Sequence, residues 1–160
     1  MVNRSQPTQN SAPPRRILAL DFGLRNIGLA VSDELGLTAQ GLETLSRSNK
    51  RRDLDHLRRI IQKYGVREIV MGLPLQMSGD EGLQAEKVRA FAEELRRRFR
   101  LPVHFYDERL TSVEANRVLR ETDMSIRRRA EAVDQLAAVL ILQSFLESRK
   151  VRASTTGLTG

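Results

Sequence analysis

The sequence lacks cysteine and tryptophan, and five phenylalanines and two tyrosines supply all of its aromatic side chains. Without cysteine the chain can form no disulfide framework, no thiolate zinc site and no cysteine nucleophile. Its two histidines have no second histidine at ligand spacing, which argues against a metal role for them. Because the aromatic residues fall mostly at core-type positions, we do not expect base stacking to be the main way of holding a nucleic-acid strand.

Long hydrophobic runs are also absent. The longest unbroken apolar stretch, residues 136–142, is far too short to cross a bilayer. Residues 1–15 are polar and contain prolines, without the apolar core of a secretory signal. We therefore expect a soluble cytoplasmic protein without a membrane partner. Because residues 1–15 and 149–160 show no apolar periodicity, we expect them to be disordered tails around one domain at 16–148.

Positive charge dominates the composition. The net charge is +7, and 23 of the 27 basic residues are arginine, the side chain that binds phosphate in a bidentate manner. A sequence pI near 10.7 makes nucleic acid the natural partner. The alternative is a basic surface without a specific ligand, which many small proteins carry.

The apolar patterning alternates between strand and helix periods. Strand-length apolar runs lie at 17–22, 27–32, 41–45, 67–72 and 103–107. Helical spacing marks 54–64, 88–99, a segment at 111–119 that opens with a capping box, and a last helix from about residue 129. This order predicts an α/β fold with a mixed five-stranded sheet, three antiparallel strands then parallel strands, and helices on both faces.

Three segments place carboxylates next to apolar residues. Asp21 ends the first strand, Asp107 and Glu108 end the fifth, and Asp134 lies in a nearly all-apolar helix. Such acids are costly to bury unless they are paired or bind a metal. Oxygen-only clusters favour Mg²⁺ or Mn²⁺, and two such ions about 3.5 to 4 Å apart clamp the attacking and leaving oxygens of a phosphodiester. The acids therefore predict a nuclease, a metal-dependent hydrolase.

Each acid also has an ordinary interpretation. Asp21, with Gly23 and Gly28 after it, is typical of a hairpin turn, although such glycines also let a phosphate or metal approach the backbone. Successive strand residues point to opposite faces, so only one of Asp107 and Glu108 easily faces Asp21, and the residues do not decide which. The other would pair with Arg109 or cap the next helix. Asp134 could form a salt bridge with an arginine at 127, 128 or 129.

Four segments together resemble the YqgF family, also called RuvX. They are LDFG at 20–23 with IGLA at 27–30, GLPLQMSG at 72–79, YDERLTS at 106–112 and VDQLAA at 133–138. Members of this family are pre-16S rRNA nucleases similar to Holliday junction resolvases, built on the RNase H fold. The resemblance implies that the first and fourth strands are neighbours with the last helix packed across them.

Carried over by motif, the family's catalytic and metal-binding acids are Asp21, Glu108 and Asp134, holding Mg²⁺ or Mn²⁺. The resemblance implies 5′-end processing of pre-16S rRNA as the activity. For contacts to the nucleic acid we expect Arg25, Lys87 and Arg109.

Three other functions stay open at this stage. A four-way DNA junction resolvase would use the same site and should be a homodimer, because two strands are cut symmetrically. A non-catalytic RNA-binding protein of ribosome assembly would keep the fold without cleavage. A nucleotide-binding protein of the actin-like type is a poorer match, because 160 residues leave room for one lobe rather than two.

Overall fold

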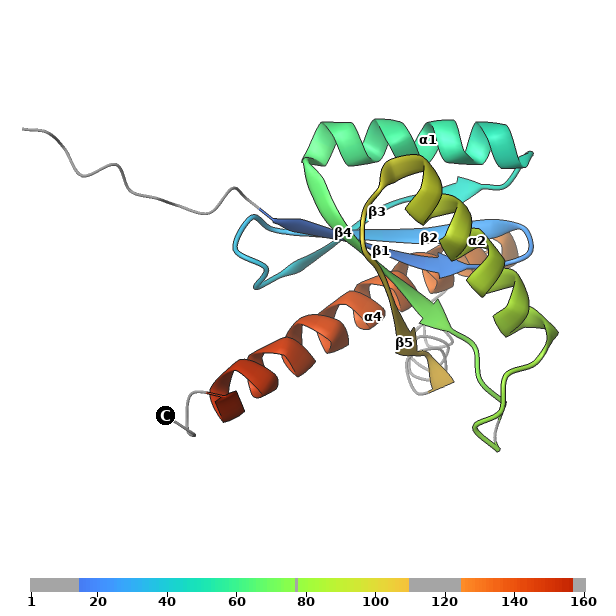
Figure 1. Cartoon of the computed structure of the whole chain (residues 1–160). Helices are drawn as coiled ribbons and strands as arrows, with labels where there is room; N and C mark the ends of the chain where they lie inside the picture. The colour runs from blue at the N-terminus through green and yellow to red at the C-terminus, as the bar shows by residue number, and fades with distance from the viewer. Residues whose placement is uncertain (1–14, 77, 110–124, 157–160) are drawn as a thin grey trace, which may run out of the picture.

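The computed structural model describes residues 15–76, 78–109 and 125–156. In this part of the chain the strands form one sheet in the order β3-β2-β1-β4-β5 (Figure 1). The strands are β1 (Arg16–Phe22), β2 (Asn26–Ser32), β3 (Ala39–Ser46), β4 (Val66–Leu73) and β5 (Val103–Asp107). β1, β2 and β3 pair antiparallel, whereas β4 runs parallel to β1 and β5. The predicted mixed sheet is confirmed, with the first and fourth strands side by side.

Helices cover both faces of the sheet, as predicted. α1 (Lys50–Tyr64) and α2 (Leu83–Phe99) lie on one face, and α4 (Ile126–Thr156) crosses the other (Figure 1). The helix expected at 111–119 lies outside the described residues. No helix in the described ranges has an apolar stretch long enough to span a membrane.

Strand alternation divides the buried side chains into two cores. On β1, Leu18 and Leu20 belong to the core under α1 and α2, whereas Ile17 and Ala19 pack against α4. The same alternation applies along β2 and β5, because successive side chains point to opposite faces, whereas register shifts interrupt it in β3 and at the start of β4. It decides on which face each polar residue at the strand ends lies.

Local signals fix the ends of α1. The Asn49 side chain accepts a hydrogen bond of 3.0 Å from the backbone N–H of Arg52, which caps the first turn. Gly65 ends the helix in the left-handed region, at φ +64°, where a residue without a Cβ is favoured. The helix therefore ends at Tyr64, the last residue of the predicted helical spacing at 54–64.

The last helix is longer at both ends than expected. It begins at Ile126 rather than near residue 129, and the tail predicted from 149 is wrong for 149–156, which continue α4. Arg149 explains part of the extension, because its guanidinium bonds Glu68 on β4 and lies 4.6 Å from the ring centroid of Phe145. Once a helix is formed, each further residue adds a hydrogen bond at little entropic cost.

Candidate active site

Asp21 lies at the carboxyl end of the central strand β1, next to last in the strand. Its side chain lies on the same face as Ile17 and Ala19, the residues that pack against α4. The neighbouring strands are β2 on one side and β4 on the other, so residues of both strands flank this carboxylate.

Glu108 comes to the same place from the end of β5. Its backbone N–H donates to the Leu73 carbonyl at 3.3 Å, which continues the pairing of β5 with β4 by one residue. Tyr106 packs towards α4, so alternation turns Glu108 to that face too. The Glu108 and Asp21 side chains share a hydrogen bond. Because such a bond between two carboxyl groups needs a proton, the pair holds one at neutral pH.

Gly72 makes this contact sterically feasible. It lies on β4, the strand between β1 and β5, and follows Met71, the partner of Leu20. A Cβ placed on Gly72 would lie 2.2 Å from Oε2 of Glu108, a distance that real Cβ atoms do not show. The absence of a side chain at this position is therefore what lets Glu108 cross β4 to reach Asp21.

On β2, Gly28 lets the backbone of α4 at Asp134 come close to Asp21. It is the register partner of Asp21 on β2, and a Cβ there would lie 1.9 Å from the Asp134 carbonyl oxygen. The backbone of α4 thus rests directly on β2 beside Asp21. Gly28 lies within the strand predicted at 27–32, but the space above it, which was expected to admit a phosphate or a metal, holds the helix backbone.

Two further contacts hold the first turns of α4. Asn26, at the start of β2, hydrogen-bonds the Asp134 carboxylate, while its own amide oxygen lies 3.5 Å from the Ser46 hydroxyl. Gln135 donates from Nε2 to the Leu42 carbonyl on β3 at 2.8 Å. Sequence reasoning missed Asn26 as a partner, because it treated the residue as part of the turn rather than of the strand.

The electrostatics of the three acids reflect their crowding. Burial first, and then the carboxylates of Glu108 and Asp134, raise the pKa of Asp21 to about 8. Burial also raises the pKa of Glu108, and the Asp107 and Asp134 charges add to that rise. The pKa of Asp134 is raised by burial as well, although the Asn26 hydrogen bond opposes the shift. An ion pair with an arginine would lower this pKa, so the salt-bridge interpretation of Asp134 is not supported.

The donor chemistry of Asp21, Glu108 and Asp134 suits a hard divalent cation, because all their ligand atoms are oxygens. Within the described ranges, however, no three acidic, histidine or cysteine side chains form a group that could hold a metal ion. Burial and the neighbouring carboxylates raise the pKa of Asp21 to about 8, so a cation that binds near neutral pH must displace a proton. The carboxylate oxygens are suitable ligands for such a cation, and the cation can bind only when the Asp21–Glu108 pair releases its proton.

Asp107 occupies a different environment from its neighbour. Its carboxylate accepts hydrogen bonds from the Arg109 side chain at 2.9 and 2.6 Å, and both residues are exposed. This arginine, through its hydrogen bonds and charge, holds the pKa of Asp107 below its usual range. The structure therefore brings Glu108 to Asp21 and leaves Asp107 in an ion pair with Arg109.

The other two expected nucleic-acid contacts come from the β1–β2 turn and from α2. Arg25 is exposed in the β1–β2 turn, and its carbonyl accepts a 2.8 Å hydrogen bond from the Arg47 backbone. Lys87 is exposed on α2 and lines a groove of about 630 Å³ with Phe22 and Leu24. That groove opens on the α1 and α2 side, so Lys87 is across the sheet from Asp21.

The match to known families covers almost the whole described chain. The RuvX family profile, described as Holliday junction resolvase, matches residues 15–148. The chain belongs to the RuvX family.

Curated RuvX relatives cover most of the chain. A Koribacter versatilis protein is 64% identical over 141 residues, which span 88% of this chain and 92% of the relative. A Moorella thermoacetica protein is 54% identical over 82% of this chain and 94% of its own length. Both carry the name "Putative pre-16S rRNA nuclease".

Solved structures of resolvases share the fold at low sequence identity. Thermus thermophilus RuvC, in complex with a Holliday junction substrate, is 14% identical with a TM-score of 0.51, covering 85% of this chain and 96% of that one. The fowlpox virus resolvase with junction DNA is 13% identical with a TM-score of 0.51, covering 83% and 97%. These likenesses confirm the resolvase-like, RNase H-like fold of this RuvX protein.

Proposed function

We propose that this RuvX protein is a divalent-metal-dependent endonuclease that hydrolyses phosphodiester bonds in structured nucleic acid. One observation carries the proposal. Asp21, Glu108 and Asp134 come from distant parts of the sequence and meet at one strand end, where burial raises the pKa of each and neighbouring carboxylates add to the rise for Asp21 and Glu108. Acids gathered at such a cost to folding stability are typical of a functional site.

Asp21, Glu108 and Asp134 would hold Mg²⁺ or Mn²⁺. Two such cations would neutralise the phosphate, activate the attacking water and stabilise the leaving oxygen. Asp21, flanked by the other two acids, would ligate from the centre of the cluster. The proton that it shares with Glu108 must leave first, so activity should rise with pH. Asn26 keeps Asp134 oriented, while Arg25 and Arg109 would contact phosphates that flank the cut.

The names of the relatives favour precursor ribosomal RNA as the substrate, with processing at the 5′ end of pre-16S rRNA, which would place the enzyme in the cytoplasm. A second candidate is resolution of four-way DNA junctions, which the family description and the fold of the resolvases support. That activity would need a homodimer. A non-catalytic role in ribosome assembly is the alternative to both.

The test is cleavage of a pre-16S RNA leader and of a four-way DNA junction by the purified protein with Mn²⁺. Asp21→Asn, Glu108→Gln and Asp134→Asn should each lower the rate by about 100-fold or more, since each removes a ligand charge. Asp107→Asn is the matched control, because it changes the adjacent acid that faces away, and it should keep activity within a few-fold.

Strict preference for the RNA leader would support the first candidate, and strict preference for the junction the second. No cleavage of either substrate by the wild-type protein, combined with tight RNA binding, would favour the assembly role instead. Equal losses in Asp107→Asn and Glu108→Gln would show that the assignment of the third acid is wrong.

A further inference from the structure

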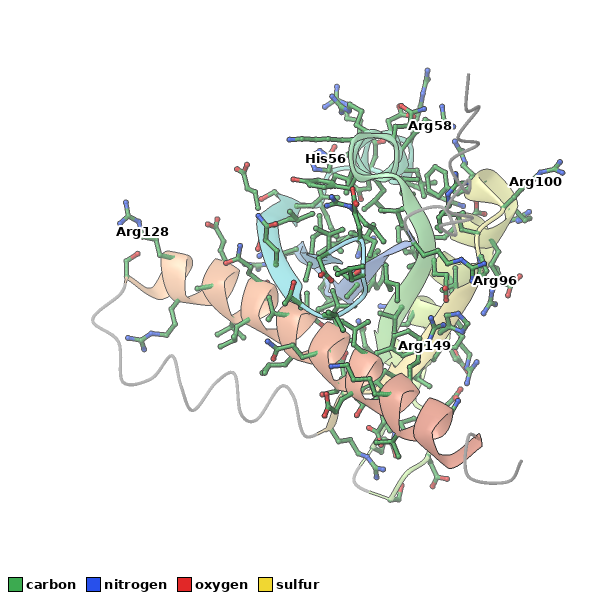
Figure 2. All side chains as sticks on the ribbon, turned by 90° about the vertical axis from the view of Figure 1, so that its left-hand side faces the viewer. His56, Arg58, Arg96, Arg100, Arg128 and Arg149 are labelled. Carbon is green, nitrogen blue, oxygen red and sulfur yellow. The ribbon has the colours of Figure 1, made fainter. Side chains whose placement is uncertain are left out.

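The exposed surface of α1 carries charge of a single sign. Its exposed charged side chains are all cations, and we call them together the α1 basic face: Lys50, Arg51, Arg52, Arg58, Arg59 and Lys63. The helix has two acids, but Asp53 is 2% exposed and Asp55 is half-buried. Figure 2 shows Arg58 on the side of α1 turned away from the sheet.

Most of the net charge of the protein comes from this short stretch. Residues 50–67 contain seven basic and two acidic residues, a net +5, against +7 for the whole chain. The remaining sequence is therefore close to neutral. Other basic runs occur at 96–100 and 127–129, but the net charge of this helix and its exit is larger than that of either run.

Five of the six cations of the α1 basic face also lack a carboxylate partner in the described part of the chain. Lys50 bonds Glu94 at 2.8 Å, but within the described ranges the other five have no carboxylate within 4.0 Å. On α2 the pattern is mixed, since Arg89, Arg96 and Arg97 each pair with a glutamate, whereas Lys87 and Arg98 have no carboxylate within 4.0 Å in the described part of the chain. The face is thus held in water with its charges available to an external anion.

Helix stability does not account for this arrangement. Three cations occupy the beginning of α1, where the helix dipole disfavours positive charge. Arg59 and Lys63 are four residues apart, a spacing at which like charges repel. Packing against the sheet accounts for Leu54 and Leu57, which are buried on the inward side of α1. The outward side only needs to be soluble, and a mixture of positive and negative side chains would serve equally well. The face carries a repulsion that a bound polyanion would relieve.

We propose that the α1 basic face is a docking surface for double-helical nucleic acid, holding an arm of the substrate away from the cut site. Cations without exposed aromatic residues bind the phosphate backbone rather than unstacked bases, which favours a duplex over a single strand. At 15 residues, α1 is roughly 22 Å long, enough to span several phosphates. That this duplex is part of the substrate rests on the proposed nuclease function.

The position of the face separates it from the acids. α1 and α4 cover opposite faces of the sheet, and Asp21 lies on the α4 side (Figure 1). The α1 basic face and the acid cluster therefore contact different parts of the nucleic acid. The face would add affinity for long, structured substrates and nothing to the cleavage of a short one.

The experiment measures binding without cleavage, in EDTA, as a function of salt. Duplex RNA of about 20 base pairs is titrated with the wild type and with the triple variant Arg51→Gln, Arg58→Gln, Arg59→Gln. Each lost phosphate contact should reduce the slope of log K against log salt by about 0.9, so the slope should fall by about 2 to 3. The matched control removes the same charge from α2 through Arg97→Gln, Arg98→Gln and Arg100→Gln, and should change the slope by less than about 1.

The same binding measurement is made with two further ligands, duplex DNA of the same length and anionic phospholipid vesicles. Weaker binding of both duplexes by the α1 variant supports a backbone site. Equal losses in the α1 and α2 variants, an unchanged slope, or α1-dependent binding to vesicles without duplex binding would each overturn the proposal. A melting temperature equal to or above that of the wild type shows that the variant is folded. Because no cleavage is needed, the result is independent of whether the nuclease proposal holds.

Discussion

Against α1 and α2 the sheet presents large side chains such as Leu20, Phe22 and Met71, whereas against α4 it presents Ala19, Ala30 and the glycines of β2 and β4. Large side chains bury more apolar surface, so the first face contributes more to folding stability. Small residues let the α4 backbone come close to the strands. The acids therefore meet on the α4 face of the sheet, where the strands carry small residues.

The two faces also differ in charge. The α4 face holds three carboxylates whose pKa values are raised, while the outer surface of α1 holds six cations, of which, among the described residues, only Lys50 has a carboxylate within 4.0 Å. Each group is unfavourable alone, since like charges repel within it. A nucleic acid with its divalent cations would relieve both repulsions, because its phosphates would neutralise the α1 cations and its divalent cations would neutralise the three carboxylates.

The largest effect should come from filling the space over β2. Gly28→Ala puts a Cβ where the Asp134 carbonyl lies, so α4 must move and carry its carboxylate away. Displacing a catalytic group by about 1 Å costs on the order of 100-fold in rate, and overpacking costs about 1 to 3 kcal/mol of unfolding free energy. Cleavage assays and urea unfolding measure the two.

Gly41→Ala is the matched control on β3. Its Cβ would meet the Gln135 side chain at 2.9 Å, and a side chain can rotate away where a backbone cannot. We expect a loss of less than about 1 kcal/mol and nearly full activity. If both variants behaved alike, close approach of the α4 backbone would not be what positions Asp134.

The next effect concerns pH. The pKa of Asp21 is about 8 in the fold, against an ordinary value of 3.8 for an aspartate. Below pH 4 both the folded and unfolded states hold the proton, and between about 4 and 8 only the folded state does, so stability should fall as pH rises through that range. Asp21→Asn should therefore raise the unfolding free energy at pH 7.5, by on the order of 2 kcal/mol, and leave it nearly unchanged at pH 4.

Asp107→Asn should do the opposite. Arg109 holds the pKa of Asp107 below its usual value, so this carboxylate contributes a small stabilisation that is present at neutral pH and lost as pH falls. Urea unfolding of both variants from pH 4 to 8 gives curves that should diverge in sign. A stabilising Asp107→Asn and a destabilising Asp21→Asn at pH 7.5 would contradict the assigned environments.

The smallest effect belongs to Asn26. Its hydrogen bond lowers the pKa of Asp134, so Asn26→Ala should raise that pKa and move the alkaline rise of the cleavage rate to higher pH. We expect a several-fold loss of activity near neutral pH that higher pH recovers. An unchanged pH profile would mean that Asn26 acts only in pairing β2 with β3.

The sequence predicted the strands well because their apolar runs were bounded by glycine and polar residues, as at Gly65. It could not choose between Asp107 and Glu108. Alternation decides once Tyr106 is known to face α4, but Phe105 and Tyr106 are both aromatic and give no pattern. The roles of Gly28 and Gly72 depend on what packs above them, which only the assembled sheet and α4 define.

A crystal soaked in Mn²⁺ at about pH 8, where the shared proton is released, tests the central claim most directly. The account predicts anomalous density between the carboxylates of Asp21, Glu108 and Asp134, and none in the same crystals of Asp21→Asn. Wild-type crystals with no Mn²⁺ at this strand end, or with Mn²⁺ bound by Asp107 instead, would contradict it.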